Sequence, residues 1–252
     1  MAADTPDSGA SATVPVLFED GDLLAVNKPA GMVAHPAYRH PDGTLYDAVT
    51  AYLGGRGEPP AWLLHRLDRD TSGVVLFAKT ERARRGVVRQ FERRMVRKGY
   101  LALVAGDIGA EMRQVSQPLR RDPLDRRRVV VDSAGQPAAT EFYALARTAE
   151  RSLVFCRPVT GRTHQIRAHL AWLGHPIVGD ATYAGDATYA PAIDAGRHLL
   201  HALALSVRHP ASGAPLQIWA PVPADFAAAL AAGWLGLCDR AHLAALGAWD
   251  AL

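Results

Sequence analysis

The chain has 252 residues, of which 49% are hydrophobic and 21% are charged, and its formal net charge is +3. It is long enough to bury a sizeable core, and its two cysteines, Cys156 and Cys238, exclude a disulfide framework or a cysteine-rich zinc site. The apolar stretch 226–238 is too short to cross a bilayer, and no Lys or Arg precedes Lys28, which argues against a signal or transit peptide. We therefore expect a cytoplasmic protein without a membrane partner.

Three regions are expected along the chain. Residues 1–13 are small, polar and acidic, which predicts a disordered tail. The dense pattern that follows predicts one domain over 14–232, with a C-terminal extension over 233–252. No internal repeat or linker is found, and the similar halves of 183–189 indicate a local duplication in a loop.

The first predicted elements are two strands and a helix. Leu23–Lys28 reads as a strand that Pro29 stops, and Val74–Ala78 reads as a second strand. Helical periodicity extends over Glu81–Arg97. Its apolar stripe consists of Val87, Phe91 and Met95, and its opposite face carries Arg82, Arg85, Arg89, Arg93 and Arg97.

Strands outnumber helices among the predicted elements. Thr163 is positioned to cap a helix over about His164–Leu173, with Gly174 beyond its end, and Asp225–Ala232 is a second predicted helix. Because strands and helices do not alternate, the order predicts an α+β fold with a mixed, largely antiparallel sheet and a central cleft. The predicted strands are Tyr100–Val104, Thr140–Ala146, Ser152–Val159 and a hairpin of Leu199–Val207 and Leu216–Ala220 around His209–Gly213.

The densest polar segment, HRLDRDTSG, runs from His65 to Gly73. A carboxylate held ionised by a neighbouring arginine suits a nucleophile, which makes Asp68 and Asp70 candidates. The alternative is a salt-bridged turn in which Asp70 caps Ser72 or Gly73. Local sequence leaves both interpretations open.

A second polar segment, TGRTHQIRAHL, covers residues 160–170. On a helix, Ile166 and Leu170 share the core side, and Arg167 lies at its edge, where it becomes partly buried. A buried guanidinium needs a carboxylate partner, and the segment 65–73 supplies one.

Positive charge is concentrated in residues 81–99, where seven arginines and one lysine oppose two glutamates, a net charge of +6. This pattern suits a phosphate backbone, and a solvated helix face is the alternative. A second basic loop contains Arg120, Arg121 and 126–128. Of the 28 basic residues only three are lysines, which favours phosphate and base contacts but is equally expected from codon bias.

Metal and kinase chemistry fit these patterns poorly. His164 and His169 are five residues apart, so a helix separates them, unlike the i,i+4 pairs of zinc helices. His65 and His175 add no ligand spacing. The HRLD sequence is similar to a kinase catalytic loop, but no glycine-rich phosphate loop accompanies it.

Together these segments resemble the RluA-type pseudouridine synthases. The segments 65–73 and 161–170, the latter continued by GHPIVGD over 174–180, look like the family signatures. The resemblance extends over about Leu17 to Phe226 and implies the pseudouridine synthase fold, with isomerisation of uridine in RNA without cofactor or metal. Supporting matches in the same order are VNKPAG at 26–31, KGYLALV at 98–104, GQPAAT at 135–140, LHA at 200–202 and HP at 209–210.

The resemblance also implies residue roles. Asp68 matches the catalytic aspartate, Tyr100 the tyrosine that stacks on the target uracil, and Arg167 the basic partner of the aspartate. Substrate binding falls to Arg66, which matches a residue that takes the place of the flipped base, to Ile166 under the ring, and to His65. Flipping is required because the glycosidic bond is inaccessible inside a stack. We expect Arg89 and Arg93 to bind the RNA backbone.

Few residues precede the match, so we expect a short form without the N-terminal ribosomal-protein-like RNA-binding domain of many members. The partner is then tRNA, 23S rRNA or both, and the protein is expected to be a monomer. The sequence does not distinguish attack at C1′ or C6 from elimination. The alternative function is a catalytically silent RNA-binding or RNA-chaperone protein on the same fold, which the combination of Asp68, Tyr100 and Arg167 disfavours.

Overall fold

The computed structural model describes residues 14–37, 40–110, 112–184 and 195–249. The expected tail over 1–13 and most of the local duplication at 183–189 lie outside these ranges. No helix in them is long and apolar enough to cross a membrane.

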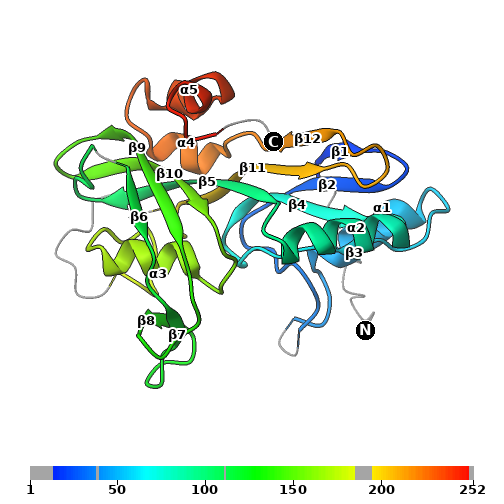
Figure 1. Ribbon diagram of the computed structural model, residues 1–252, viewed down its shortest axis with the longest axis horizontal. Helices are drawn as coiled ribbons and strands as arrows, with labels where there is room; N and C mark the ends of the chain where they lie inside the picture. The colour runs from blue at the N-terminus through cyan, green and yellow to red at the C-terminus, as the bar shows by residue number, and fades with distance from the viewer. Residues whose placement is uncertain (1–13, 38–39, 111, 185–194, 250–252) are drawn as a thin grey trace, which may run out of the picture.

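Within the described ranges, ten strands form one long sheet that runs across the whole molecule (Figure 1). Its main path is β1-β2-β4-β11-β5-β10-β9-β6, with β3 added beside β4 and β12 beside β11. Among the strand pairs of the described residues, only β4–β11 is parallel, so the predicted mixed, mostly antiparallel sheet is confirmed. The strands are β1 (Val16–Glu19), β2 (Leu23–Lys28), β3 (Trp62–Leu63), β4 (Ser72–Ala78), β5 (Arg97–Ala105), β6 (Arg113–Val115), β9 (Thr140–Arg147), β10 (Arg151–Pro158), β11 (Leu200–Arg208) and β12 (Pro215–Trp219).

The remaining elements pack on this sheet or extend from it. In Figure 1, α3 lies below the left part of the sheet, and α4 and α5 lie above it. A separate hairpin of β7 (Leu119–Arg121) and β8 (Val129–Val131) packs against α3. The helices are α1 (Leu45–Gly54), α2 (Glu81–Glu92), α3 (Gln165–Trp172), α4 (Ala224–Ala229), the 3-10 helix η1 (Trp234–Cys238) and α5 (Arg240–Ala245).

The parallel contact between β4 and β11 depends on Gly73. This residue has φ +116°, and a Cβ there would lie 2.2 Å from the carbonyl oxygen of Ala202. Any larger residue would therefore separate the strands. Side chains reinforce the junction, since Ser72 Oγ lies 2.9 Å from His201 Nδ1 and Thr71 Oγ1 lies 2.9 Å from His198 Nε2.

The predicted helix over Glu81–Arg97 is too long. α2 ends at Glu92, Arg94 has φ 56°, and β5 begins at Arg97. Arg97 lies opposite Ser206 of β11, so pairing in the middle of the sheet overrides the helical periodicity. Met95, expected in the buried stripe, is 40% exposed.

Two other helix boundaries also differ. His164, not Thr163, is the N-cap of α3, because Gln165 Oε1 accepts hydrogen bonds from Arg162 N–H and Thr160 Oγ1 and fixes the preceding turn. The helix predicted over Asp225–Ala232 is shorter, since the backbone is extended at Leu230. The hairpin of β11 and β12 agrees with the prediction.

Candidate active site

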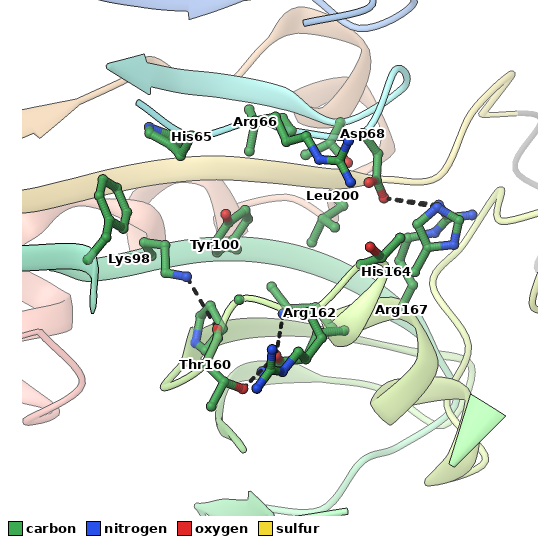
Figure 2. A pocket seen from close by; sticks show the side chains of 18 residues that line it. His65, Arg66, Asp68, Lys98, Tyr100, Thr160, Arg162, His164, Arg167 and Leu200 are labelled. Carbon is green, nitrogen blue, oxygen red and sulfur yellow. Dashed lines mark hydrogen bonds and ion pairs between the residues drawn. The ribbon is translucent and has the colours of Figure 1, made fainter. Parts of the chain in front are cut away.

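A pocket of about 320 Å³ lies beside the β4–β11–β5 junction, a size typical of small-molecule sites (Figure 2). The loop 65–68, the first residues of β5 and the segment 158–167 form its walls. Segments nearly 100 residues apart in sequence therefore meet here. The predicted site residues that line the pocket are His65, Arg66, Asp68, Tyr100, Ile166 and Arg167.

Asp68 lies on the loop between β3 and β4, and the side chain of Lys28 holds this loop in place. Lys28, which is fully buried, donates hydrogen bonds of 2.8 Å from Nζ to the carbonyls of Pro29, Met32 and Arg69. Burial lowers the pKa of Lys28 to about 7, and the three carbonyls match the three N–H groups of its ammonium form. The loop is thus tied to the end of β2, so its position is fixed by the sheet.

Arg167 projects from α3 toward Asp68, and its side chain is only 6% exposed. Its Nη1 donates to Asp68 Oδ2 at 3.0 Å, while Nε and Nη2 donate to the two carboxylate oxygens of Asp180 at 2.7 and 2.8 Å. Burial alone would lower the pKa of the guanidinium, but Asp180 and Asp68 raise it above its ordinary value. Arg167 is therefore a fixed cation beside Asp68.

The sequence did not lead us to predict Asp180 as a partner of Arg167, although Asp180 is the last residue of the segment 174–180. It is 1% exposed, more deeply buried than Asp68 at 29%. A signal was present, since a buried arginine needs a buried carboxylate, but spacing alone does not show which carboxylate lies on the adjacent loop.

Tyr100 and Ile166 line the pocket, Tyr100 from β5 and Ile166 from α3. Burial and the charge of Asp68 raise the pKa of the Tyr100 phenol above its ordinary value. Tyr100 is therefore protonated at neutral pH. Ile166 is 6% exposed and packs in the core around α3.

His65 and Lys98 form the opposite end of the pocket. His65 Nε2 accepts the backbone N–H of Leu76 at 3.1 Å, its ring lies 5.5 Å from that of Phe91, and burial lowers its pKa to about 3, so it is neutral. Lys98 was not predicted; its Nζ donates to the Thr160 carbonyl at 3.2 Å, and burial lowers its pKa to about 8. Lys98 lies two residues before Tyr100, so the alternation of side chains along a strand predicts that the two side chains share one face of β5.

The structure does not place Arg89 and Arg93 in the pocket wall. Both are exposed on or next to α2, and within the described part of the chain neither pairs with a carboxylate. Other arginines of this helix are paired: Arg82 with Asp22, and Arg84 and Arg85 with Glu81. Phe91 connects the helix to the pocket.

The histidines considered as metal ligands have other partners in the structure. His169 Nδ1 lies 2.9 Å from Thr140 Oγ1 and its Nε2 lies 3.0 Å from the Gln117 carbonyl, while His175 Nδ1 lies 2.9 Å from the Ala105 carbonyl. Among the described residues, no cluster of three or more His, Cys, Asp or Glu side chains is arranged to hold a metal ion.

Comparison with known proteins identifies relatives of this chain. The RNA pseudouridylate synthase family matches residues 22–172. The ribosomal large subunit pseudouridine synthases D of Nitrosomonas europaea and Xylella fastidiosa are each 40% identical, over 222 and 227 residues. Each alignment covers 86% of this chain, which spans 64% and 68% of the length of these relatives.

Solved structures show the same fold. Human RNA pseudouridylate synthase domain containing 1 superposes with a TM-score of 0.70 at 27% identity, covering 85% of this chain and 86% of that one. Human RNA pseudouridylate synthase domain containing 4 gives a TM-score of 0.68 at 26% identity, with 84% and 90% covered.

Proposed function

The chain belongs to the RNA pseudouridylate synthase family, of the RluA type, and on this premise we propose that it isomerises uridine in a structured RNA to pseudouridine. The observation that carries the proposal is the Asp68 carboxylate in the pocket, 3.0 Å from the buried cation of Arg167. That cation favours the ionised form that a nucleophile requires.

In the proposed reaction the N1–C1′ bond of uridine breaks, the base turns, and a C5–C1′ bond forms. A proton leaves C5 and N1 gains one, so the product is an isomer and no co-reactant is consumed. Asp68 either attacks C1′ or C6 and holds a covalent intermediate while the base turns, or assists an elimination in which the base is released and turns without a bond to Asp68. The base enters the pocket by flipping out of the RNA stack.

The pocket side chains receive roles by position. Tyr100 and Ile166 are proposed to hold the two faces of the flipped uracil, since an aromatic ring and an apolar side chain suit its π-faces. Arg66 is exposed at the rim and is proposed to fill the gap that the base leaves in the RNA. His65, which is neutral, is proposed to contact the base.

Outside the pocket, Arg89 and Arg93 are proposed to bind phosphates, because both are exposed and neither forms an ion pair within the described part of the chain. The β7–β8 hairpin adds a second basic surface with Arg121 and Arg126, and Leu124 at its tip is 95% exposed. RNA contacts on both surfaces would give a strong dependence of affinity on salt.

The substrate is proposed to be large-subunit ribosomal RNA, because the matched relatives are named for the ribosomal large subunit. Transfer RNA is the alternative. The comparison is made by mapping pseudouridine in total RNA from strains with and without the gene. A modified position that disappears only from tRNA would overturn the ribosomal assignment.

The activity itself is tested with purified protein and transcribed 23S rRNA and tRNA, with pseudouridine read by carbodiimide labelling and primer extension. Wild-type protein is expected to modify at least one RNA, whereas the Asp68→Asn variant binds RNA without modifying it. Tight RNA binding by wild type with no modification of either RNA would favour the silent RNA-binding alternative.

A further inference from the structure

His164 has an unusual backbone conformation for which helix capping gives no reason. It has φ 51° and ψ 19°, in the left-handed region that non-glycine residues rarely adopt. Residues in such conformations are found most often at functional sites. Its side chain makes no cap hydrogen bond to α3. The ring instead lies beside Asp68 and Arg167 in the pocket (Figure 2), with Nε2 3.7 Å from Asp68 Oδ2.

The other ring nitrogen of His164 contacts Tyr183, at 3.1 Å between Nδ1 and the phenol Oη. That Oη already accepts the backbone N–H of Val129 at 2.9 Å. Burial raises the pKa of Tyr183 to about 12, so the phenol keeps its proton at neutral pH. Among the described residues, the acceptor in reach of this proton is His164 Nδ1, so Tyr183 donates to it.

The charge state of His164 follows from its surroundings. Burial lowers the pKa of its imidazole; the negative charges of Asp68 and Asp180 oppose that shift, and the positive charges of Arg167 and Arg66 add to it. The ring is therefore neutral at neutral pH. Because Nδ1 accepts from Tyr183, the single ring proton is on Nε2, the nitrogen that faces Asp68.

We infer that His164 and Tyr183 form a positioning pair that directs an N–H group at Asp68, an inference that rests on the proposed function of Asp68. Arg167 and His164 both approach Oδ2 of the carboxylate. At 3.7 Å the His164 contact is an oriented dipole rather than a hydrogen bond. Two N–H groups directed at one oxygen fix the carboxylate plane and leave Oδ1 to act on the substrate.

The tautomer is measured directly, without RNA. Long-range ¹H–¹⁵N spectra of protein labelled in its histidines distinguish Nε2–H from Nδ1–H rings, and the His164→Gln variant assigns the signal. We expect Nε2–H in wild type near neutral pH and a shift toward Nδ1–H in Tyr183→Phe. Tyr52→Phe, whose Oη donates to Glu19 of the edge strand β1, is the control and leaves the signal unchanged. An Nδ1–H or doubly protonated His164 in wild type overturns the inference.

Function is tested by single-turnover rates at saturating RNA. His164→Ala is expected to lower the rate about tenfold with unchanged RNA affinity, whereas His164→Gln, which restores an N–H donor, stays within about threefold of wild type. Both variants keep a Cβ on the left-handed backbone of residue 164, and only Gln carries a side-chain N–H donor. Equal rates for Ala and Gln contradict the positioning role. If Asp68→Asn is fully active, the proposed function fails instead, while the tautomer result stands independently.

Discussion

Asp68 and Asp70 are two residues apart, yet their surroundings differ at the level of single side chains. Asp68 faces the pocket and the buried Arg167, whereas Asp70 pairs with Arg69, whose side chain is 57% exposed. The predicted cap of Ser72 or Gly73 by Asp70 is not the contact that the structure shows. The two carboxylates therefore form a matched pair for testing chemistry against turn structure.

Asp68→Asn is expected to reduce isomerisation by more than about a thousandfold, because an amide lacks the negative charge needed for nucleophilic work. RNA affinity should be retained, since the basic surfaces are elsewhere. Asp70→Asn is the control and should cost far less activity. Both are compared by single-turnover assay and by RNA binding; substantial activity in Asp68→Asn would assign the chemistry to another residue.

Arg167→Met is expected to leave the carboxylates of Asp68 and Asp180 without their cation, and Asp180 is the more buried of the two. Adding Asp180→Asn to Arg167→Met should recover a few kcal/mol of unfolding free energy, and adding Asp68→Asn only about 1 kcal/mol, because water screens Asp68 better. Urea unfolding of the single and double variants measures both couplings. Equal coupling free energies for Arg167–Asp180 and Arg167–Asp68 would show that the deeper burial of Asp180 does not strengthen its interaction with Arg167.

At the scale of elements, the basic segment 81–99 is divided between a helix and a strand. The sequence predicts one helix with an arginine stripe, but the backbone turns at Arg94 and enters the sheet at Arg97. As a result Arg97 and Lys98 both lie in β5, and Lys98 also lines the pocket, while Arg89 and Arg93 remain exposed to solvent. This separation divides the segment into a pocket wall and a charged surface.

Changing Arg89 and Arg93 to Glu is expected to weaken RNA binding and to flatten the slope of log affinity against log salt by about 0.7–0.9 for each phosphate that is no longer neutralised. The fold should persist, because both side chains are exposed. Arg240→Glu at the start of α5 is the control for a single charge change away from α2. In Figure 1, α5 lies above the left part of the sheet and α2 lies on the right. Filter binding at several salt concentrations gives the slopes; an unchanged slope places the RNA elsewhere.

At the scale of the whole molecule, the segment after residue 232 packs into the core. Cys238, Leu243 and Trp249 belong to the largest buried cluster, and the Trp249 ring meets those of Phe155 and Trp219 at 6.1 and 5.7 Å. A Cβ on Gly99 of β5 would meet the rings of Phe155 and Trp249. The boundary predicted at 232 stays a prediction, but the residues beyond it support the sheet that carries Tyr100.

Trp249→Ala is expected to lower the unfolding free energy by about 3–5 kcal/mol, the cost of a cavity left by a large buried ring. Trp172→Ala is the control, since Trp172 is 52% exposed and should cost about 0.5 kcal/mol. Urea denaturation of both variants measures the difference. Similar midpoints for the two would show that the C-terminal segment is dispensable for stability.

By itself the sequence determined the strand-rich α+β class, most strands of the sheet, and the two polar segments that meet in the pocket. Alternating and continuous apolar runs report burial locally, and the spacing of Asp68 and Arg167 within their segments carries the resemblance to the family. Only the tertiary structure decided the end of α2, the N-cap of α3, and the partners Asp180, Lys98 and His164. Each of these depends on residues distant in the chain: sheet pairing competes with helical periodicity, and a buried charge selects its partner by proximity in space.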